Sequence, residues 1–434
     1  MKPTINIFWF RRDLRLDDNR GFFEALKSDL PILPVFIFDS DILDKLPKDD
    51  ARVTFIYETL QNMRGSLQND HQSDMAIYQG TPLGVFKALV KTYRINTVFT
   101  NHDYEPYSIN RDKIIAGFLQ EHHIAFKTFK DHVIFEKDDI VKSDGNPYLV
   151  YTPYMKTWKA QFTSNDIKGY NTSLHFDNLL AQEKQPTIKL SDIGFIKSRQ
   201  SIAPYKLSAS LIKAYEAKRN FPAIEATSRL GPHLRFGTVS IRNIVKKAMA
   251  EKQEVFLQEL IWREFFMQIL WHFPHTVNNC FKPKYDRIQW RNNEADFKAW
   301  CHGKTGYPLV DAGMRQLNET GFMHNRVRML VGSFLCKHLL IDWRWGEAYF
   351  AEKLHDYELA SNIGNWQWVA GCGVDAAPYF RIFNPTTQIQ KFDNNLTYIK
   401  KWVPDVQELT YPQPIVEHKF ARERCLNFYK EALN

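Results

Sequence analysis

Two short strings in the second half of the chain combine acids, cations, amides and large rings at helical spacing. Glu259, Trp262 and Arg263 stand three and four residues apart, so one helical face would carry a carboxylate, an indole and a guanidinium. Asn325 and Met329 are also four residues apart and face the same way. A buried structural face rarely holds such a set. A salt-bridged surface helix with Trp262 in the core nevertheless explains the first string when it stands alone.

Two further strings point to binding rather than packing. Residues Asp356–Asn362 run into Trp366–Trp368, a mixture too charged and too aromatic for a plain core. Tyr215–Arg219 is followed by Thr227–Pro232, where small hydroxyl side chains, an arginine and a glycine precede a helix. Backbone N–H groups and a helix N-terminus at such a turn favour a phosphate. An ordinary helix cap is the common alternative.

Familiar catalytic signatures are missing. The 14 histidines form no H-E-x-x-H spacing, and the chain has no G-x-S-x-G turn. Gly303-Lys304-Thr305 looks like a phosphate loop, but Lys298 stands where its first glycine belongs. The five cysteines form no C-x-x-C pair, which argues against zinc and against a disulfide framework. We therefore expect no metal and disfavour a hydrolase, a kinase or a metalloenzyme.

The charge and the tryptophans are both concentrated in the second half. Residues 1–200 carry 26 basic and 26 acidic side chains, whereas residues 201–434 carry 31 and 23. Nine of the 11 tryptophans follow residue 260. A regional basic excess is typical of a protein that binds a phosphate backbone, although a basic solvated surface explains the charge equally well.

The first part of the chain alternates buried strands with amphipathic helices. We expect strands at Ile5–Phe10, Ile32–Phe38, Met75–Tyr78 and Thr97–Thr100. We expect helices at Ala51–Leu67, Pro82–Tyr93 and Ile109–His122. This alternation predicts an α/β domain with a parallel, Rossmann-like sheet. Arg11, Arg12 and Asp13 follow the first strand in place of G-x-G-x-x-G, so no dinucleotide is expected at that turn.

The rest of the chain divides into a polar connection and a helical region. We expect an α/β domain over residues 1–130, a connector over 131–200 and an all-α domain over 201–434. Helix-length amphipathic segments follow one another after residue 205, with breaks at Gly231-Pro232, Phe273-Pro274 and Asn384-Pro385. No run of about 20 uncharged apolar residues suggests a membrane span. The start of the chain lacks a signal-peptide layout, so we expect a cytoplasmic protein.

Several strings, taken in order along the chain, resemble the photolyase/cryptochrome family. The matching segments are Trp9–Asn19 (WFRRDLRLDDN), Tyr148–Trp158 (YLVYTPYMKTW), Gly303–Pro308, Asp311–Leu317 and Tyr379–Gln388 (YFRIFNPTTQ). The resemblance covers nearly the whole chain. It implies one non-covalent FAD in the helical domain, which would then be an all-α FAD-binding domain.

The resemblance also implies which residues hold the cofactor. Asn362 would sit at flavin N5, and Arg328 would pair with Asp356 over the ring system. Glu358 stands where close relatives often carry Asp, which is a mild departure. The residues implied to contact FAD are Tyr215, Arg219, Thr227, Ser228, Arg229, Leu230, Gly231, Glu259, Arg328, Asp356, Glu358 and Asn362.

Within the family, the residues of the substrate face favour class I enzymes that repair cyclobutane pyrimidine dimers. The implied catalytic residues are Glu259, Asn325 and Met329, and the implied DNA contacts are Trp262, Arg263 and Trp368. The resemblance implies a deoxyribodipyrimidine photo-lyase that acts on ultraviolet-damaged DNA. Blue light would drive an electron from reduced FAD to a flipped-out dimer and back. Stacking between two indoles would hold that dimer.

Two parts of the implied picture concern light rather than repair. Trp290, Trp343 and Trp366 resemble the family's chain of electron carriers to photoexcited flavin. The alternative for each of them is a tryptophan that only packs in the core. The resemblance leaves open a second, antenna chromophore of unknown identity. Glu105–Arg111 lacks the Asn-Glu pair of folate-binding members, so a deazaflavin, a second flavin or no antenna all stay open.

The main alternative is a cryptochrome-like blue-light photoreceptor with a signalling role. Such proteins often carry a C-terminal extension, and this sequence ends shortly after Trp402-Val403-Pro404. A flavin- or DNA-binding module without photochemistry is a further alternative. We expect a monomer whose partner is damaged DNA and which does not associate with membranes.

Overall fold

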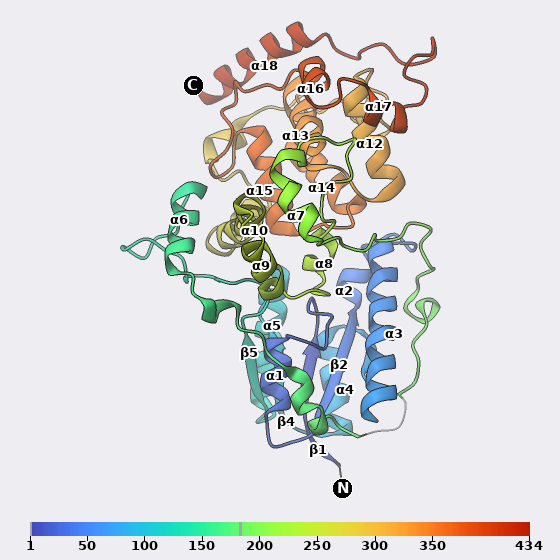
Figure 1. Ribbon diagram of the computed structural model, residues 1–434, viewed down its shortest axis with the longest axis vertical. Coiled ribbons are helices and arrows are strands. Elements are labelled where there is room, and N and C mark those ends of the chain that lie inside the picture. Colours follow the sequence, from blue (N-terminus) through green and yellow to red (C-terminus); the bar gives the residue numbers. More distant parts are fainter. Residues whose placement is uncertain (1, 182–184) are drawn as a thin grey trace. The chain divides into compact units, whose positions relative to one another are not determined.

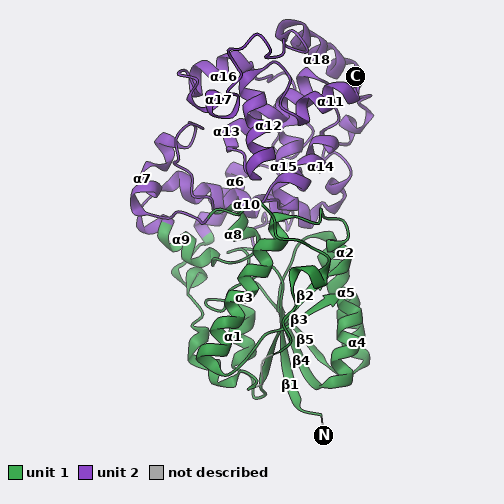
Figure 2. Cartoon of the chain, turned by 90° about the vertical axis from the view of Figure 1, so that its right-hand side faces the viewer, with its two compact units in different colours: residues 1–136, 161–203, 230–247 green, residues 137–160, 204–229, 248–434 purple. Residues whose placement is uncertain are grey.

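Five parallel strands form the first of two units into which the chain divides. The computed structural model describes residues 2–181 and 185–434. The first unit takes residues 1–136, 161–203 and 230–247, and the second takes residues 137–160, 204–229 and 248–434 (Figure 2). The two units interleave along the chain and are defined by contacts. The domain boundaries expected near residues 130 and 200 stay a prediction.

The sheet of the first unit has the strand order β3-β2-β1-β4-β5, and each neighbouring pair is parallel. The strands are β1 (Thr4–Phe10), β2 (Ile32–Asp39), β3 (Ala76–Gly80), β4 (Arg94–Asn101) and β5 (Ala125–Phe129). The four expected strands are confirmed. The sequence did not indicate β5, because this edge strand has three exposed residues among five and no buried apolar run.

Alternate side chains of the strands meet helices on opposite faces of the sheet. Phe8 and Phe10 pack with residues of α1 (Arg20–Leu26) and α3 (Ala51–His71). Ile7 and Trp9 pack with residues of α4 (Pro82–Thr92) and α5 (Pro106–Glu121). Figure 2 shows these helix pairs on the two sides of the sheet. This layering confirms the predicted α/β class.

The remaining helices of the first unit are short or lie at its end. They are α2 (Ser40–Leu43), α8 (Gly231–Arg235), α9 (Ile241–Ala250, whose last three residues belong to the second unit), and the 3-10 turns η1 (Ser164–Ile167), η2 (Thr172–Asn178) and η3 (Leu190–Ile193). All three of these 3-10 turns fall in the polar connector expected over residues 131–200.

The named elements of the second unit are all helices, as predicted (Figure 1). Its longer helices are α6 (Tyr151–Gln161, whose last residue belongs to the first unit), α7 (Ala209–Lys218), α10 (Glu254–His272), α11 (Glu294–Cys301), α12 (Pro308–Thr320), α13 (Asn325–Ser333), α14 (Trp343–Lys353), α15 (Leu359–Ala370), α16 (Pro385–Phe392), α17 (Thr397–Trp402) and α18 (His418–Leu433). Its short turns are η4 (Pro274–Val277), η5 (Pro283–Arg287) and the π-helical η6 (Phe334–His338).

Helix α15 lies in the middle of the second unit's core. Its buried side chains Ile363, Trp366 and Val369 pack in one cluster with residues of α12, α13 and α14. Gly371, with φ of 90°, ends the helix in the left-handed conformation that glycine adopts without strain. The polar residues of α15 are therefore held on a rigid element.

Gly346 lets α14 approach α15 closely. A Cβ atom on Gly346 would lie 2.1 Å from Cη2 of Trp366, far inside van der Waals contact. Trp366 is 3% exposed and packs against Trp300 and Phe350, so moving it away from α14 would disturb these neighbours. The indole of Trp366 can therefore occupy this position only because residue 346 of the neighbouring helix has no side chain.

We predict that Gly346→Ala lowers the free energy of unfolding by about 2 kcal/mol, because overpacking displaces Trp366. Gly65, within α3, provides the matched control, since a Cβ there would meet nothing within 4 Å. Gly65→Ala is expected to raise stability by up to about 1 kcal/mol through helix propensity. Urea denaturation of both variants checks this, and equal effects would show that the contact with Trp366 is unimportant.

Candidate functional site

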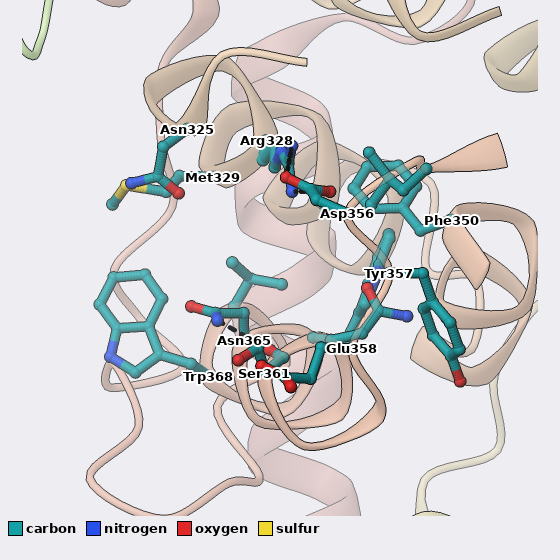
Figure 3. A pocket seen from close by; sticks show the side chains of 15 residues that line it. Asn325, Arg328, Met329, Phe350, Asp356, Tyr357, Glu358, Ser361, Asn365 and Trp368 are labelled. Carbon is teal, nitrogen blue, oxygen red and sulfur yellow. Dashed lines mark hydrogen bonds and ion pairs between the residues drawn. The ribbon is translucent and has the colours of Figure 1, made fainter. Parts of the chain in front are cut away.

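Two cavities in the second unit share one wall. The residues common to both are Asn325, Met329, Ser361, Asn365 and Trp368. We call the side that also contains Arg328, Asp356 and Asn362 the inner cavity. We call the side that also contains Arg219, Glu259 and Trp262 the outer cavity, which has a volume of about 290 Å³. Figure 3 shows the inner cavity with the common residues around it.

A two-pronged ion pair lies on one side of the inner cavity. Nη1 and Nη2 of Arg328 donate to the two carboxylate oxygens of Asp356 at 3.1 and 2.8 Å. Nε of Arg328 donates to the carbonyl of Met323 at 2.7 Å, so the guanidinium is held in one orientation. The expected pair is present. Its contact with a flavin stays a prediction.

The amide of Asn362 is oriented by Glu347. Nδ2 of Asn362 donates to the backbone carbonyl and to Oε1 of Glu347, at 3.1 and 2.9 Å. Burial raises the pKa of the Glu347 carboxyl, while its bonds from Asn362 and Tyr357 act against that shift. Because the nitrogen of Asn362 is engaged, its oxygen is the atom left to accept a hydrogen bond from a ligand.

Arg263, expected to contact DNA, is bonded to a buried acid. Its Nε and Nη2 donate to the carboxylate of Glu358 at 3.0 and 3.3 Å. Both side chains are about nine-tenths buried. Arg263 still lines the outer cavity, but its charge is compensated within the protein. Its main observed contact ties α10 to the residue before α15.

The outer cavity brings together an acid, a guanidinium and two indoles. Glu259 accepts a charge-assisted hydrogen bond from Arg219. Trp262 is stacked against Tyr151, with ring centroids 3.6 Å apart and planes 8° apart. The other indole on this wall is Trp368. Arg219, expected to flank the cofactor, lies on the outer cavity beside Tyr215, over whose ring its guanidinium stands at 5.5 Å.

The residues of the expected phosphate loop, Thr227–Gly231, do not all line one cavity. Helix α8, which follows the loop, is five residues long, so the loop's own N–H groups would have to provide most of any anion binding. Leu230 and Gly231 belong to the first unit and Thr227–Arg229 to the second. Thr227 and Arg229 line a third, smaller cavity, and Ser228 accepts a backbone hydrogen bond from Lys206. The loop's role in binding FAD stays a prediction.

The three tryptophans expected to carry electrons differ in burial. Trp366 lines the inner cavity and is 3% exposed, and Trp343 is 1% exposed. Trp290 is half-buried and packs against Phe428 and Tyr429. Of the three, only Trp366 lines the inner cavity and Trp290 is the most exposed, and electron transfer along them stays a prediction.

Sequence reasoning missed several residues of both cavities. Ser361 and Asn365 line both, Phe350 and Tyr357 line the inner one, and Phe266 lines the outer one. Ser361 and Asn365 stand four residues apart on α15, and each is next to a predicted site residue, Asn362 or Trp366. Helical spacing could therefore have found them. Phe350 and Tyr357 carry no comparable signal, because aromatic residues at helical spacing are usually core.

His324 caps the helix that carries Asn325 and Met329. Its Nδ1 accepts from the backbone N–H of Arg326 at 3.2 Å, which leaves the proton on Nε2. Burial, followed by the charges of Arg328 and Arg229, lowers the pKa of His324 to about 4. The imidazole is thus a neutral cap at ordinary pH.

The described residues bear on three expected absences. No helix among them is both long and apolar enough to cross a bilayer. Across residues 2–181 and 185–434, no three His, Cys, Asp or Glu side chains gather as a metal site would. The five cysteines are buried and none takes part in a disulfide.

Two family models match this chain. The model for the FAD binding domain of DNA photolyase matches residues 256–410, and the model for DNA photolyase matches residues 6–172. A deoxyribodipyrimidine photo-lyase from Synechococcus is 36% identical over 98% of this chain and 96% of its own length.

Solved structures agree over the full length. A class III photolyase from Agrobacterium tumefaciens has a TM-score of 0.89 at 32% identity, covering all of this chain and 98% of its own. A Sulfolobus tokodaii photolyase with two FAD molecules has 0.82 at 33%, covering 98% and 99%. A Synechocystis cryptochrome has 0.84 at 26%, covering 99% of both chains.

The parallel sheet, the helical unit with its ion-paired cavity and these matches define a member of the photolyase/cryptochrome family. Within that family the chain is a DNA photolyase, a lyase that binds FAD.

We predict that acid weakens the FAD-free protein through His324. Because the pKa of His324 is lowered from 6.5 to about 4, the folded state resists protonation, and stability falls as pH drops through that window. Between pH 7 and pH 5 the loss is about 2 kcal/mol. His324→Asn keeps a capping side chain that does not titrate, so the urea midpoint of this variant should fall less over the same range. If the urea midpoints of the parent protein and of His324→Asn fall equally with pH, His324 is not the group responsible.

Proposed function

We propose that this photolyase repairs cyclobutane pyrimidine dimers in ultraviolet-damaged DNA with blue light. The observation that carries the proposal is the wall shared by the two cavities. The inner side has the donors and acceptors that a flavin requires, and the outer side has the indoles and the acid that a flipped dimer requires. Asn325, Met329 and Trp368 would then separate donor from acceptor by a single layer of side chains.

The residues of the inner cavity fit a reduced flavin. The guanidinium of Arg328 is fixed by Asp356 and supplies positive charge beside a ring that becomes anionic on reduction. The oxygen of Asn362 is free to accept from a protonated N5, because Glu347 holds the nitrogen. Tyr215, Arg219, the Thr227–Gly231 loop, Glu259 and Glu358 remain proposed contacts for the rest of FAD.

FAD, when bound in its reduced form and excited by blue light, supplies one electron to the dimer and receives it back. The chain's own residues position the dimer for this step. Trp262 and Trp368 offer flat surfaces to the two pyrimidines, and Tyr151 keeps Trp262 from turning. The amide of Asn325 would donate a hydrogen bond to a carbonyl oxygen on which negative charge develops, and Glu259 would do the same in its protonated form.

DNA binding would draw on the basic side chains near the outer cavity. Arg219 and Arg326 are partly buried, and Arg326 is bonded to Asn220 at 2.6 Å, so both are presented in fixed orientations. Phosphate contacts of this kind make affinity fall with salt. The class I assignment, a monomeric state and a cytoplasmic location stay predictions.

A light-signalling role is the second candidate. The observation in its favour is the match to the Synechocystis cryptochrome over 99% of both chains. A chain that photoreduces its flavin but leaves dimers intact would support signalling over repair.

A second chromophore is proposed for the first unit. In doubly wound sheets, ligands bind at the carboxyl ends of the strands where the order reverses, here between β1 and β4. The Sulfolobus tokodaii photolyase holds two FAD molecules. Arg11 and Arg12, at the end of β1, are paired with Asp112 and with Asp103 and Glu105, so an antenna would meet a compensated rather than a free charge. Its identity stays open.

We predict that the FAD-loaded, chemically reduced protein restores the thymine absorbance of irradiated oligothymidine under blue light, and not in the dark. Trp262→Ala should reduce repair at least tenfold by removing a stacking surface, with bound FAD unchanged. Glu259→Ala should slow repair similarly. Absence of light-dependent recovery in the parent protein would refute the repair function, and loss of FAD in the Trp262 variant would show that this indole serves the cofactor.

We predict that Trp343→Phe slows photoreduction of oxidised FAD at least tenfold, because phenylalanine is far harder to oxidise than tryptophan. Nε1 of Trp343 has no hydrogen-bond partner among the described residues, so the replacement costs no bond. Repair by chemically reduced protein should be retained. Flash absorption of the flavin and the repair assay check the two halves, and an equal loss of both would refute a separate electron route.

A further inference from the structure

We propose that Asn365 determines dimer specificity, because its side-chain amide pairs with the N3–H and O4 edge of one pyrimidine of the lesion. This inference rests on the proposed repair function and deepens it. Asn325 would serve the other ring, so that the pocket holds one carboxamide for each pyrimidine of the dimer.

Asn365 occupies the open side of α15. Ser361 and Asn365 lie one turn apart and line both cavities, whereas their neighbours Asn362 and Trp366 are buried. Asn365 itself is exposed. In Figure 3 its carboxamide lies on the same side of the cavity as Trp368 and Asn325. The side chain is therefore reachable by a base that enters from solvent.

The amide of Asn365 is oriented but not saturated. Its Nδ2 donates to the carbonyl of Ser361 at 2.8 Å, which uses one of its two N–H groups. The second N–H and Oδ1 make no other hydrogen bond within the described residues. The carboxamide of Asn325 also makes none there. Each amide thus offers one donor next to one acceptor.

That pair of groups matches the edge of a thymine. Thymine presents an N3–H donor beside an O4 acceptor, and a carboxamide meets this edge with two hydrogen bonds. Cytosine presents the two groups in reversed order, so Asn365 would have to turn over and lose its bond to Ser361. The fixed amide therefore favours thymine or uracil.

The apolar part of the wall makes the pairing consequential. Trp262, Phe266, Met329 and Trp368 form the apolar part of the lining of the outer cavity and would cover the faces of a bound ring. A base edge left without partners in such surroundings loses its hydration without replacement. Discrimination is stronger there than on an open surface.

The test compares dissociation constants of the FAD-loaded, reduced protein for single-stranded oligonucleotides with a thymine dimer or with a cytosine-containing dimer, measured in the dark. Asn365→Leu, which is nearly isosteric and a better helix former, should weaken binding of the thymine dimer about tenfold. Asn365→Asp, which has only acceptors, should weaken the thymine dimer more than the cytosine-containing one. Asn165→Leu, at an exposed site in the first unit, is the control and should change neither constant.

Flavin absorbance of each variant is measured alongside. Unchanged binding by Asn365→Leu, or loss of FAD instead of loss of affinity, would overturn the role of Asn365 while leaving the repair function intact. Failure of the parent protein to bind a thymine dimer better than undamaged DNA would overturn the repair function, and this proposal with it.

Discussion

Two arginine–carboxylate pairs fix the helix on which both cavities depend. Asp356 and Glu358 are two residues apart in the segment before α15, and they are bonded to Arg328 of α13 and Arg263 of α10 respectively. Removing one member of a buried pair typically costs about 3–5 kcal/mol, because the other charge is left uncompensated. The start of α15 is thereby bonded to α13 and to α10. This fixes the positions of the polar residues of α15 that line the two cavities.

Much of the fold could be predicted because burial leaves a strong local mark. The inner strands of the sheet are buried on both faces, so Ile5–Phe10 and Ile32–Phe38 read as short apolar runs. The strand β5 lies at the edge of the sheet, and three of its five residues are exposed. Its sequence therefore carries no such run. The division into units could not be read either, since residues 161–203 return to the first unit through contacts between distant parts of the chain.

The site was predictable where function and helical spacing coincide. Glu259 and Trp262, and Asn325 and Met329, are each set by their own helix, and the structure brings all four to one cavity. The hydrogen-bond and stacking partners of the site residues could not be predicted in this way. That Arg263 bonds to Glu358, that Glu347 orients Asn362 and that Tyr151 covers Trp262 are contacts across 15 to 111 positions of sequence, which no local pattern encodes.

The pairing of Arg219 with Glu259 has a consequence for how damage is told from intact DNA. The acid of the outer cavity already has a partner, so a base that enters must exchange that partner rather than fill a vacancy. A dimer brings the N3–H groups of two linked bases, which can donate to Glu259, and a DNA phosphate, which can accept from Arg219. A single undamaged base brings only one N3–H, so fewer of the displaced partners would be replaced. Rejection of normal bases would then arise from an unfinished exchange, independently of the shape of the pocket.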